Sequence, residues 1–238
     1  MTFGRRLVDG TPVGDGVTVD ADGPTAEALG RRTSPVISNP IAGEWVTTLV
    51  AGDETDGEYE RGLALYRADN DGPPEHIHPS YEEYFEVLEG SFVFVVDGQR
   101  RTLVAGDHVT VPHGTPHTFR NDADAVASCI VETRPAGELR GVIATLSGLA
   151  HDGKLTERGT PRFLQAMVIA AELADDTVFT SPPPPVQKLL AAIVAPVARR
   201  LGYRATYPTY LDTAYWMKRV EQPGSTARRT RPSERRVR

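Results

Sequence analysis

The chain has 238 residues, of which 39% are hydrophobic and 24% charged, so its composition predicts a folded globular protein and excludes wholesale disorder or a fibrous architecture. The formal net charge is −6, although residues 222–238 carry six Arg and only one Glu. The rest of the chain is therefore strongly acidic, which disfavours nucleic acid as a partner.

Cysteine usage and hydropathy favour a cytoplasmic protein. The single cysteine, Cys129, cannot form an intrachain disulfide, which suits a reducing compartment. The first residues lack the apolar core of a secretory signal, and the longest strongly apolar stretch, 189–198, is shorter than the about 20 residues that a membrane span needs. We therefore expect no membrane partner. The large excess of Arg over Lys is typical of GC-rich bacterial genomes.

Residues 1–133 are predicted to form an irregular arm and then a β-structure. Residues 1–34 are rich in Gly, Asp and Thr, with one short helical turn expected at 25–29. Short apolar or alternating runs follow, which predict antiparallel strands in a sandwich or barrel. The Asp97-Gly98 pair predicts a tight two-residue hairpin. The runs lie at 44–50, 61–67, 82–90, 91–96, 99–104, 107–112, 117–121 and 125–133.

After residue 135 the hydrophobic period changes to that of a helix. Three helices are predicted, within residues 138–150, 162–176 and 186–202. The third is apolar nearly all round, so we expect it to be buried against the barrel, another subunit or a hydrophobic ligand, with a kink or early end at Pro196. Residues 222–238 are expected to form a disordered basic tail.

Two segments bring together residues that bind metals. His76 and His78 lie two positions apart, so on a strand both imidazoles point to the same face, and Glu83 follows across a short bend. His117 lies in a second segment, 106–121. A His-x-His pair alone is also compatible with two surface histidines. The remaining histidines, His108, His113 and His151, are expected to face solvent.

Together the two segments resemble the two signature motifs of the cupin family. The first motif of that family combines His-x-His with Glu and Gly, and the second combines Gly, Pro-x-Gly, His and Asn. One position departs, because Gly72 lies closer to His76 than the glycine that usually opens the first motif. The matching positions are His76, His78, Glu83, Gly90, Gly106, Pro112, Gly114, His117 and Asn121.

The resemblance covers about residues 40–135, and residues 182–210 resemble a C-terminal extension of many uncharacterised bacterial cupins. It implies an all-β barrel of the cupin type, a jelly roll or double-stranded β-helix, with a C-terminal α-helical annex. We therefore divide the chain into an arm at 1–34, a barrel at 35–135, a helical extension at 136–221 and the tail at 222–238. Cupin barrels commonly dimerise through an outer sheet, so the resemblance also implies a homodimer.

The implied metal ligands are His76, His78, Glu83 and His117, with Glu83 also the candidate catalytic residue. Three imidazoles and one carboxylate suit one divalent transition metal, Fe, Mn, Ni, Co, Cu or Zn, whereas the absence of thiolate ligands argues against a structural zinc site. Strand alternation suggests an aromatic pocket for an apolar or aromatic small molecule, although these side chains could equally fill the barrel. The pocket candidates are Tyr66, Phe85, Phe92, Phe94 and Phe119.

Three functions are compatible with such a site. The first is a metal-dependent oxygenase, an oxidoreductase acting on a small phenolic, enolic or diketone compound, as the resemblance implies for flavonol and diketone dioxygenases. The second is redox-neutral isomerisation, cyclisation or decarboxylation, which resembles the chemistry of other cupins with the same four ligands. The third is a non-catalytic protein that binds a metal or a small molecule, because fold and metal do not guarantee turnover.

Overall fold

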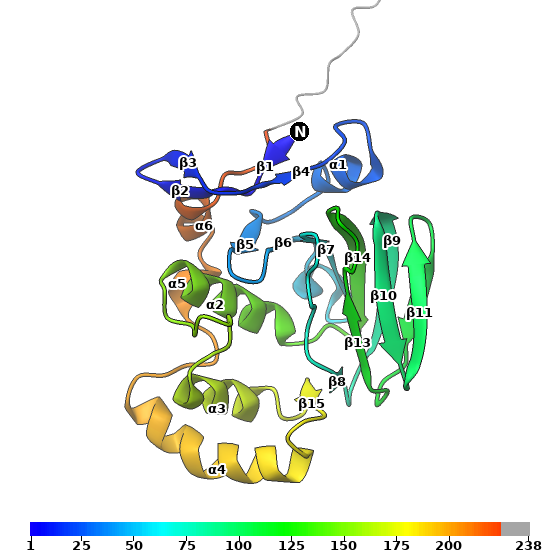
Figure 1. Cartoon of the computed structure of the whole chain (residues 1–238). Helices are drawn as coiled ribbons and strands as arrows, with labels where there is room; N and C mark the ends of the chain where they lie inside the picture. Colours follow the sequence, from blue (N-terminus) through cyan, green and yellow to red (C-terminus); the bar gives the residue numbers. More distant parts are fainter. Residues whose placement is uncertain (225–238) are drawn as a thin grey trace, which may run out of the picture.

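The computed structural model describes residues 1–224, which form a β-barrel with a helical annex along one side (Figure 1). From residue 225 onward, the predicted disordered tail lies outside the described residues. The strands of the barrel are β5 (Ile37–Asn39), β6 (Glu44–Val50), β7 (Glu60–Tyr66), β8 (His76–Ile77), β9 (Glu82–Glu89), β10 (Ser91–Val96), β11 (Gln99–Val104), β12 (His108–Val111), β13 (His117–Arg120) and β14 (Ala127–Arg134), joined by β15 (Val178–Phe179) from the annex.

These strands form two antiparallel sheets with a jelly-roll order. One sheet has the order β12-β9-β14-β7-β6-β5, and the other the order β11-β10-β13-β8-β15. A short 3₁₀ helix, Gly52–Thr55, lies between β6 and β7. Each predicted run from 44 to 133 contains a strand, so the all-β barrel predicted from alternation is confirmed.

The tight hairpin predicted at Asp97-Gly98 is confirmed. Asp97 has a φ of 48° and Gly98 a φ of 71°, as a type I′ turn requires, and Val96 pairs with Gln99 across it. The alternation in β10 then directs Phe92 and Phe94 into the barrel, where both are fully buried. The hairpin thus sets the register of the strands that fill the interior.

The N-terminal segment is more ordered than the sequence predicted. The short helical turn is present as α1 (Pro24–Leu29), but β1 (Thr2–Phe3) also pairs with β4 (Val17–Thr18), and β2 (Arg6–Val8) with β3 (Thr11–Val13). Strands of two or three residues are too short to show a period, so the expectation of an irregular arm was wrong. Phe3, Val17 and Leu29 are buried in a cluster with Trp45 of β6 and residues of β7.

The two ends of the described chain lie side by side. Arg6 forms a β-bridge with Val220. The Gly4 amide donates to the carbonyl of Glu221, the Glu221 amide donates to that of Arg5, both at 2.8 Å, and the Arg5 guanidinium makes an ion pair with the Glu221 carboxylate. Residues 220–222 therefore belong to the packed fold and not to a free tail.

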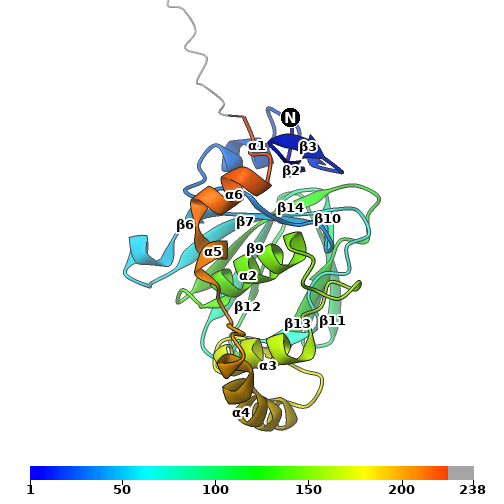
Figure 2. The ribbon, with the colours of Figure 1, turned by 90° about the vertical axis from the view of Figure 1, so that its left-hand side faces the viewer.

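The helical annex packs along one side of the barrel, as the turned view shows (Figure 2). It contains α2 (Leu139–His151), α3 (Phe163–Glu172), α4 (Pro184–Arg200), α5 (Pro208–Leu211) and α6 (Thr213–Arg219). The three predicted helices are confirmed as α2, α3 and α4. α2 lies against β5 and α5, and α3 packs on α4. Among residues 1–224, every helix is too short or too polar to cross a bilayer.

The packing of α4 differs from the expectation. α4 runs through Pro196 without ending there, and it packs mainly on α3. Its buried residues are Ala191, Ala195 and Ala198, whereas Leu189 and Ile193 are 62% and 63% exposed. Within the single chain the helix is therefore not buried against the barrel by its large side chains, because its small ones face the neighbour, and burial against another subunit or a hydrophobic ligand stays a prediction.

Candidate metal centre

The four predicted metal ligands lie at one end of the barrel, between the two sheets. His76 lies on β8 and His78 just after it, while His117 begins β13 and pairs directly with His76. Glu83 comes from β9 of the facing sheet. All four side chains are buried, and one ligand atom from each lies within 4.8 Å of the others.

The cluster is almost completely withdrawn from solvent. His117 is fully buried, and His76, His78 and Glu83 are at most 6% exposed. Ionised carboxylates are rarely buried unless an opposite charge or a metal accompanies them. The burial of Glu83 among three imidazoles therefore requires a cation, either a proton or a metal ion.

The outer nitrogens of two imidazoles fix where their protons lie. The Nδ1 atom of His76 lies 2.8 Å from the carbonyl of Pro74, and that of His117 lies 3.0 Å from the carbonyl of Thr115. A carbonyl oxygen only accepts, so each Nδ1 carries the proton and donates it. In the neutral rings each Nε2 then presents a lone pair, which is the form that binds metals.

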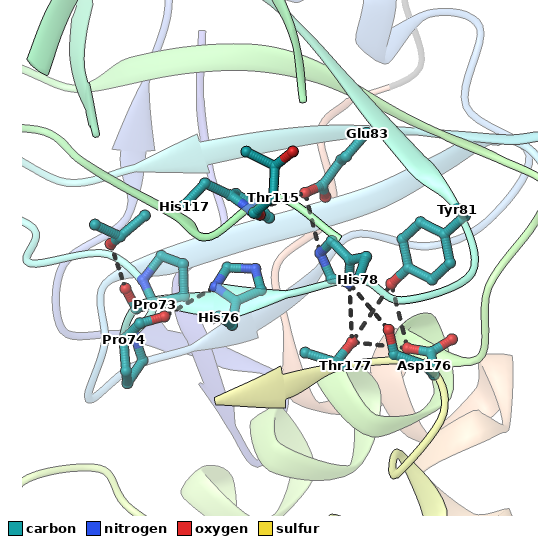
Figure 3. A network of polar contacts seen from close by, with 11 residues as sticks. Pro73, Pro74, His76, His78, Tyr81, Glu83, Thr115, His117, Asp176 and Thr177 are labelled. Carbon is teal, nitrogen blue, oxygen red and sulfur yellow. Dashed lines mark hydrogen bonds and ion pairs between the residues drawn. The ribbon is translucent and has the colours of Figure 1, made fainter. Parts of the chain in front are cut away.

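The third imidazole, His78, directs its Nε2 atom at Glu83 (Figure 3). The Nε2 atom of His78 lies 3.2 Å from Oε2 of Glu83, and the Nε2 atom of His117 lies 3.1 Å from the same oxygen. The His78 Nε2 atom is buried and has no hydrogen-bond partner among residues 1–224. An orphaned nitrogen facing a carboxylate, with two further Nε2 atoms nearby, fits a divalent transition metal.

The pKa shifts agree with this donor set. Burial, and secondly the neighbouring His117, lower the pKa of His76 to about 4, so this imidazole is neutral at pH 7. Burial alone would raise the pKa of Glu83, but its contacts with His117 and His78 outweigh that effect and lower the pKa to about 2. Near neutral pH the site therefore offers an ionised carboxylate and a neutral imidazole.

The predicted pocket residues form the packed interior of the barrel. Phe94 stacks on Phe119 with ring centroids 5.4 Å apart and meets Phe85 edge-on at 5.0 Å, while Tyr66 lies edge-on to both Phe92 and Phe119. All five are buried in one cluster. These aromatic contacts fill the space behind the four polar side chains.

A hollow of about 230 Å³ lies between β10, β11 and β12, and Phe94 is the one predicted pocket residue that lines it. Val96, another lining residue, pairs across the sheet with His117, and Val109 lies two residues before the partner of Glu83, Val111. None of the four predicted ligands lines the hollow itself. Its lining comprises Phe94, Val96, Asp97, Gln99, Arg101, Leu103, Val109 and Thr110.

Of the three histidines outside the cluster, two are exposed and one is buried. His108 and His113 are exposed, as expected, whereas His151 is buried at the end of α2, with Nε2 3.0 Å from the hydroxyl of Ser38, so its solvent-facing prediction was wrong. Sequence reasoning also missed Asp176 and Thr177, which contact His78 from the annex. Nothing in the local sequence links positions almost one hundred residues apart.

Comparisons with known proteins agree with the fold and the motifs. Residues 65–131 match the family described as "Cupin domain". Quercetin 2,3-dioxygenase of Bacillus subtilis (strain 168) is 33% identical over 80 residues, which cover 34% of this chain and 24% of that protein. Polyketide synthase CurC of Streptomyces cyaneus is 34% identical over 74 residues, 31% of this chain and 47% of that protein. The chain thus spans less than half the length of either relative.

Matches among solved structures include an RmlC-like cupin from Shewanella frigidimarina, 22% identical with a TM-score of 0.39, which covers 45% of this chain and 89% of that one. KdgF from Halomonas sp. is 17% identical with a TM-score of 0.37, and the match covers 41% of this chain and 84% of that one. The sequence motifs, the jelly-roll order of the sheets and the match at residues 65–131 lead to one conclusion. The chain contains a cupin domain at residues 65–131.

Proposed function

We propose that the protein binds one divalent transition metal through His76, His78, Glu83 and His117 and is an oxygenase of a small phenolic, enolic or diketone compound. One observation carries the metal-binding part: the four ligand atoms lie within 4.8 Å of one another, and two of the imidazoles have Nδ1 protons held by backbone carbonyls. The similarity to a quercetin 2,3-dioxygenase supports the oxygenase part.

Such an ion, when bound, would supply Lewis acidity and, if redox-active, reactivity towards dioxygen. The residues of the chain hold the donor set in a dry site, since all four are buried. Glu83 is the candidate catalytic residue because it is the carboxylate of the cluster. With a pKa of about 2 it is a weak base, so we assign it first to holding the metal and second to accepting a proton from the substrate.

The hollow between β10, β11 and β12 is our candidate for the site of a small substrate. Its volume of about 230 Å³ lies below the roughly 300–1,000 Å³ of sites for drug-sized ligands. Phe94, Val96 and Leu103 supply apolar walls, while Arg101 supplies a guanidinium. Apolar walls with one guanidinium, Arg101, and one carboxylate, Asp97, suit a compact aromatic or enolic compound with polar substituents, because hydrogen bonds to the charged groups fix its orientation.

A second candidate is redox-neutral chemistry on the same class of compound. The similarity to polyketide synthase CurC favours it, since polyketides contain the enolic and diketone groups that a metal would chelate. Both candidates use the same four ligands and the same hollow, and they differ in whether dioxygen is consumed.

The test begins with metal-free protein loaded in turn with Fe, Mn, Ni, Co, Cu and Zn. Elemental analysis should give close to one ion per chain for the parent protein and for His113→Ala, which removes an exposed histidine, and much less for His117→Ala. Equal metal content in His117→Ala and the parent would refute the site.

Loaded protein is then mixed with a panel of phenols, enols and β-diketones in an oxygen electrode, and the products are analysed by mass spectrometry. Dioxygen uptake in step with substrate loss supports the oxygenase. Substrate conversion without uptake replaces it with redox-neutral chemistry, and binding without conversion by any metal form would show a non-catalytic binding protein.

A further inference from the structure

The annex contributes a strand to the sheet that carries the histidines. β15 pairs with β8, with Val178 opposite Ile77 and Phe179 opposite His76, and the amide of Thr180 donates to the carbonyl of Glu75 at 3.1 Å. On its other side, β8 is paired with β13 only at His76 and His117. The two-residue strand β8 is therefore held in place partly by the annex.

The residues just before β15 contact the ring of His78 (Figure 3). The Nδ1 atom of His78 lies 3.2 Å from the hydroxyl oxygen of Thr177 and 3.2 Å from the backbone carbonyl of Asp176. Asp176 and Thr177 are both buried. Tyr81 stacks on the same imidazole, with ring centroids 4.3 Å apart. The ring is thus fixed in its plane by Tyr81 and along its edge by the annex.

Counting protons shows which atom of each pair donates. The Thr177 hydroxyl has one proton and lies 2.7 Å from the carboxylate oxygen Oδ1 of Asp176, which accepts it. The hydroxyl oxygen can then only accept from His78, and the Asp176 carbonyl also only accepts. His78 Nδ1 must therefore be the donor, which leaves the lone pair of the neutral ring on Nε2, the atom that faces Glu83.

The Asp176 carboxylate is itself held in place by three donors. Besides Thr177, Oδ1 accepts from the hydroxyl of Tyr81 at 3.2 Å, and Oδ2 accepts from the amide of Glu138 at 2.7 Å, at the start of α2. Asp176 thus links the β8–β9 connection, α2 and the segment before β15. Because a change at Asp176 would disturb all three, Thr177 is the better residue to test.

We propose that Thr177, oriented by Asp176, is a positioning residue that holds His78 with Nε2 directed at Glu83, so that the helical annex completes the metal centre of the barrel. The inference rests on the metal site of the proposed function. Groups that donate or accept at the outer nitrogen of a metal-binding histidine typically change metal affinity by about 10- to 100-fold when they are removed.

The experiment compares Thr177→Val, which removes the hydroxyl at nearly constant volume, with Thr177→Ser, which keeps it. The matched control is Thr180→Val, in the same segment, whose hydroxyl contacts Glu75 and no histidine. We expect Co²⁺ affinity to fall about 10-fold or more in Thr177→Val, with an altered visible spectrum of bound Co²⁺, and to stay within about twofold of the parent in the other two.

A second measurement needs neither metal nor a variant that folds. Long-range ¹⁵N–¹H NMR of the metal-free parent protein reports which nitrogen of His78 carries the proton, and we expect Nδ1. A proton on Nε2 would overturn the inference, as would parent-like Co²⁺ affinity in folded Thr177→Val or a failure of Thr177→Ser to restore it. If the parent bound no metal, the proposed function would fail while the NMR result still decided whether His78 Nδ1 donates to the annex.

Discussion

The buried imidazole of His151 should make the fold sensitive to acid. Burial, and secondly the positive charges of Arg6 and Arg219, lower the pKa of His151 to about 4, from an ordinary value of about 6.5. Since the folded-state pKa is depressed, the neutral ring stabilises the fold above pH 6.5. This stability is lost as the pH falls, because the unfolded chain takes up a proton that the folded protein does not accept until about pH 4.

The magnitude follows from the two pKa values. Each unit of pKa difference corresponds to about 1.4 kcal/mol, so His151 should account for about 2 kcal/mol of stability lost between pH 7.5 and pH 5.0. His151→Gln keeps a polar group near Ser38 but cannot titrate. We expect the fall in unfolding free energy over this interval to be about 2 kcal/mol smaller in the variant than in the parent.

The assay is urea unfolding of metal-free protein at both pH values, with chelator present so that the metal centre does not contribute. His113→Gln is the control, because it removes an imidazole from an exposed turn. An unchanged difference between pH 7.5 and pH 5.0 in His151→Gln would refute the assignment of this acid sensitivity to His151.

Three further predictions test the packing, each by urea unfolding at pH 7.5. Phe94→Ala should lower the unfolding free energy by about 3–5 kcal/mol, since the ring is fully buried. Phe163→Ala, at a residue 58% exposed, should change it little, and equal losses in the two variants would contradict the assigned interior. On α4, Ile193→Ala should change the unfolding free energy by about 0.5 kcal/mol or less, because the side chain is exposed. Ala195→Leu should lower it by about 1–3 kcal/mol through overpacking against α3. A larger loss in Ile193→Ala than in Ala195→Leu would show that the helix packs by its other face. Gln222→Ala should lose about 1–2 kcal/mol, because this side chain bonds the amide and the carbonyl of Val36, and an unaffected variant would show that residue 222 belongs to a free tail after all.

Much of the barrel could be predicted from the sequence because its signals are local. Alternation gives each strand two faces, and the Asp97-Gly98 turn fixes one register by itself. The sequence motifs also select His76, His78, Glu83 and His117, whose ligand atoms lie within 4.8 Å of one another in the structure. Their role as ligands stays a prediction. The homodimer likewise stays a prediction.

What the sequence could not provide depends on contacts between distant positions. Thr177 lies 99 residues from His78, and no period or turn signal connects them. The pattern of α4 could not reveal which face meets α3, because large apolar side chains surround the alanines. His151 begins the polar segment 151–159, which suggests exposure, yet its ring contacts Ser38 and Trp216. Each of these contacts forms only in the folded tertiary structure and has no local signal in the sequence.

The pairing of residues 4–6 with residues 220–221 has a consequence for the order of folding during synthesis. Arg5 and Glu221 are 216 positions apart, so the first strand segments leave the ribosome long before their partners exist. At about 5–20 residues per second, the interval is roughly ten to forty seconds. During that time Phe3 and Val17 can join the outer surface of the six-stranded sheet, but the neighbouring backbone of Gly4 and Arg5 must wait. Closure of this end is therefore a late step in the formation of the fold, after the barrel that it covers.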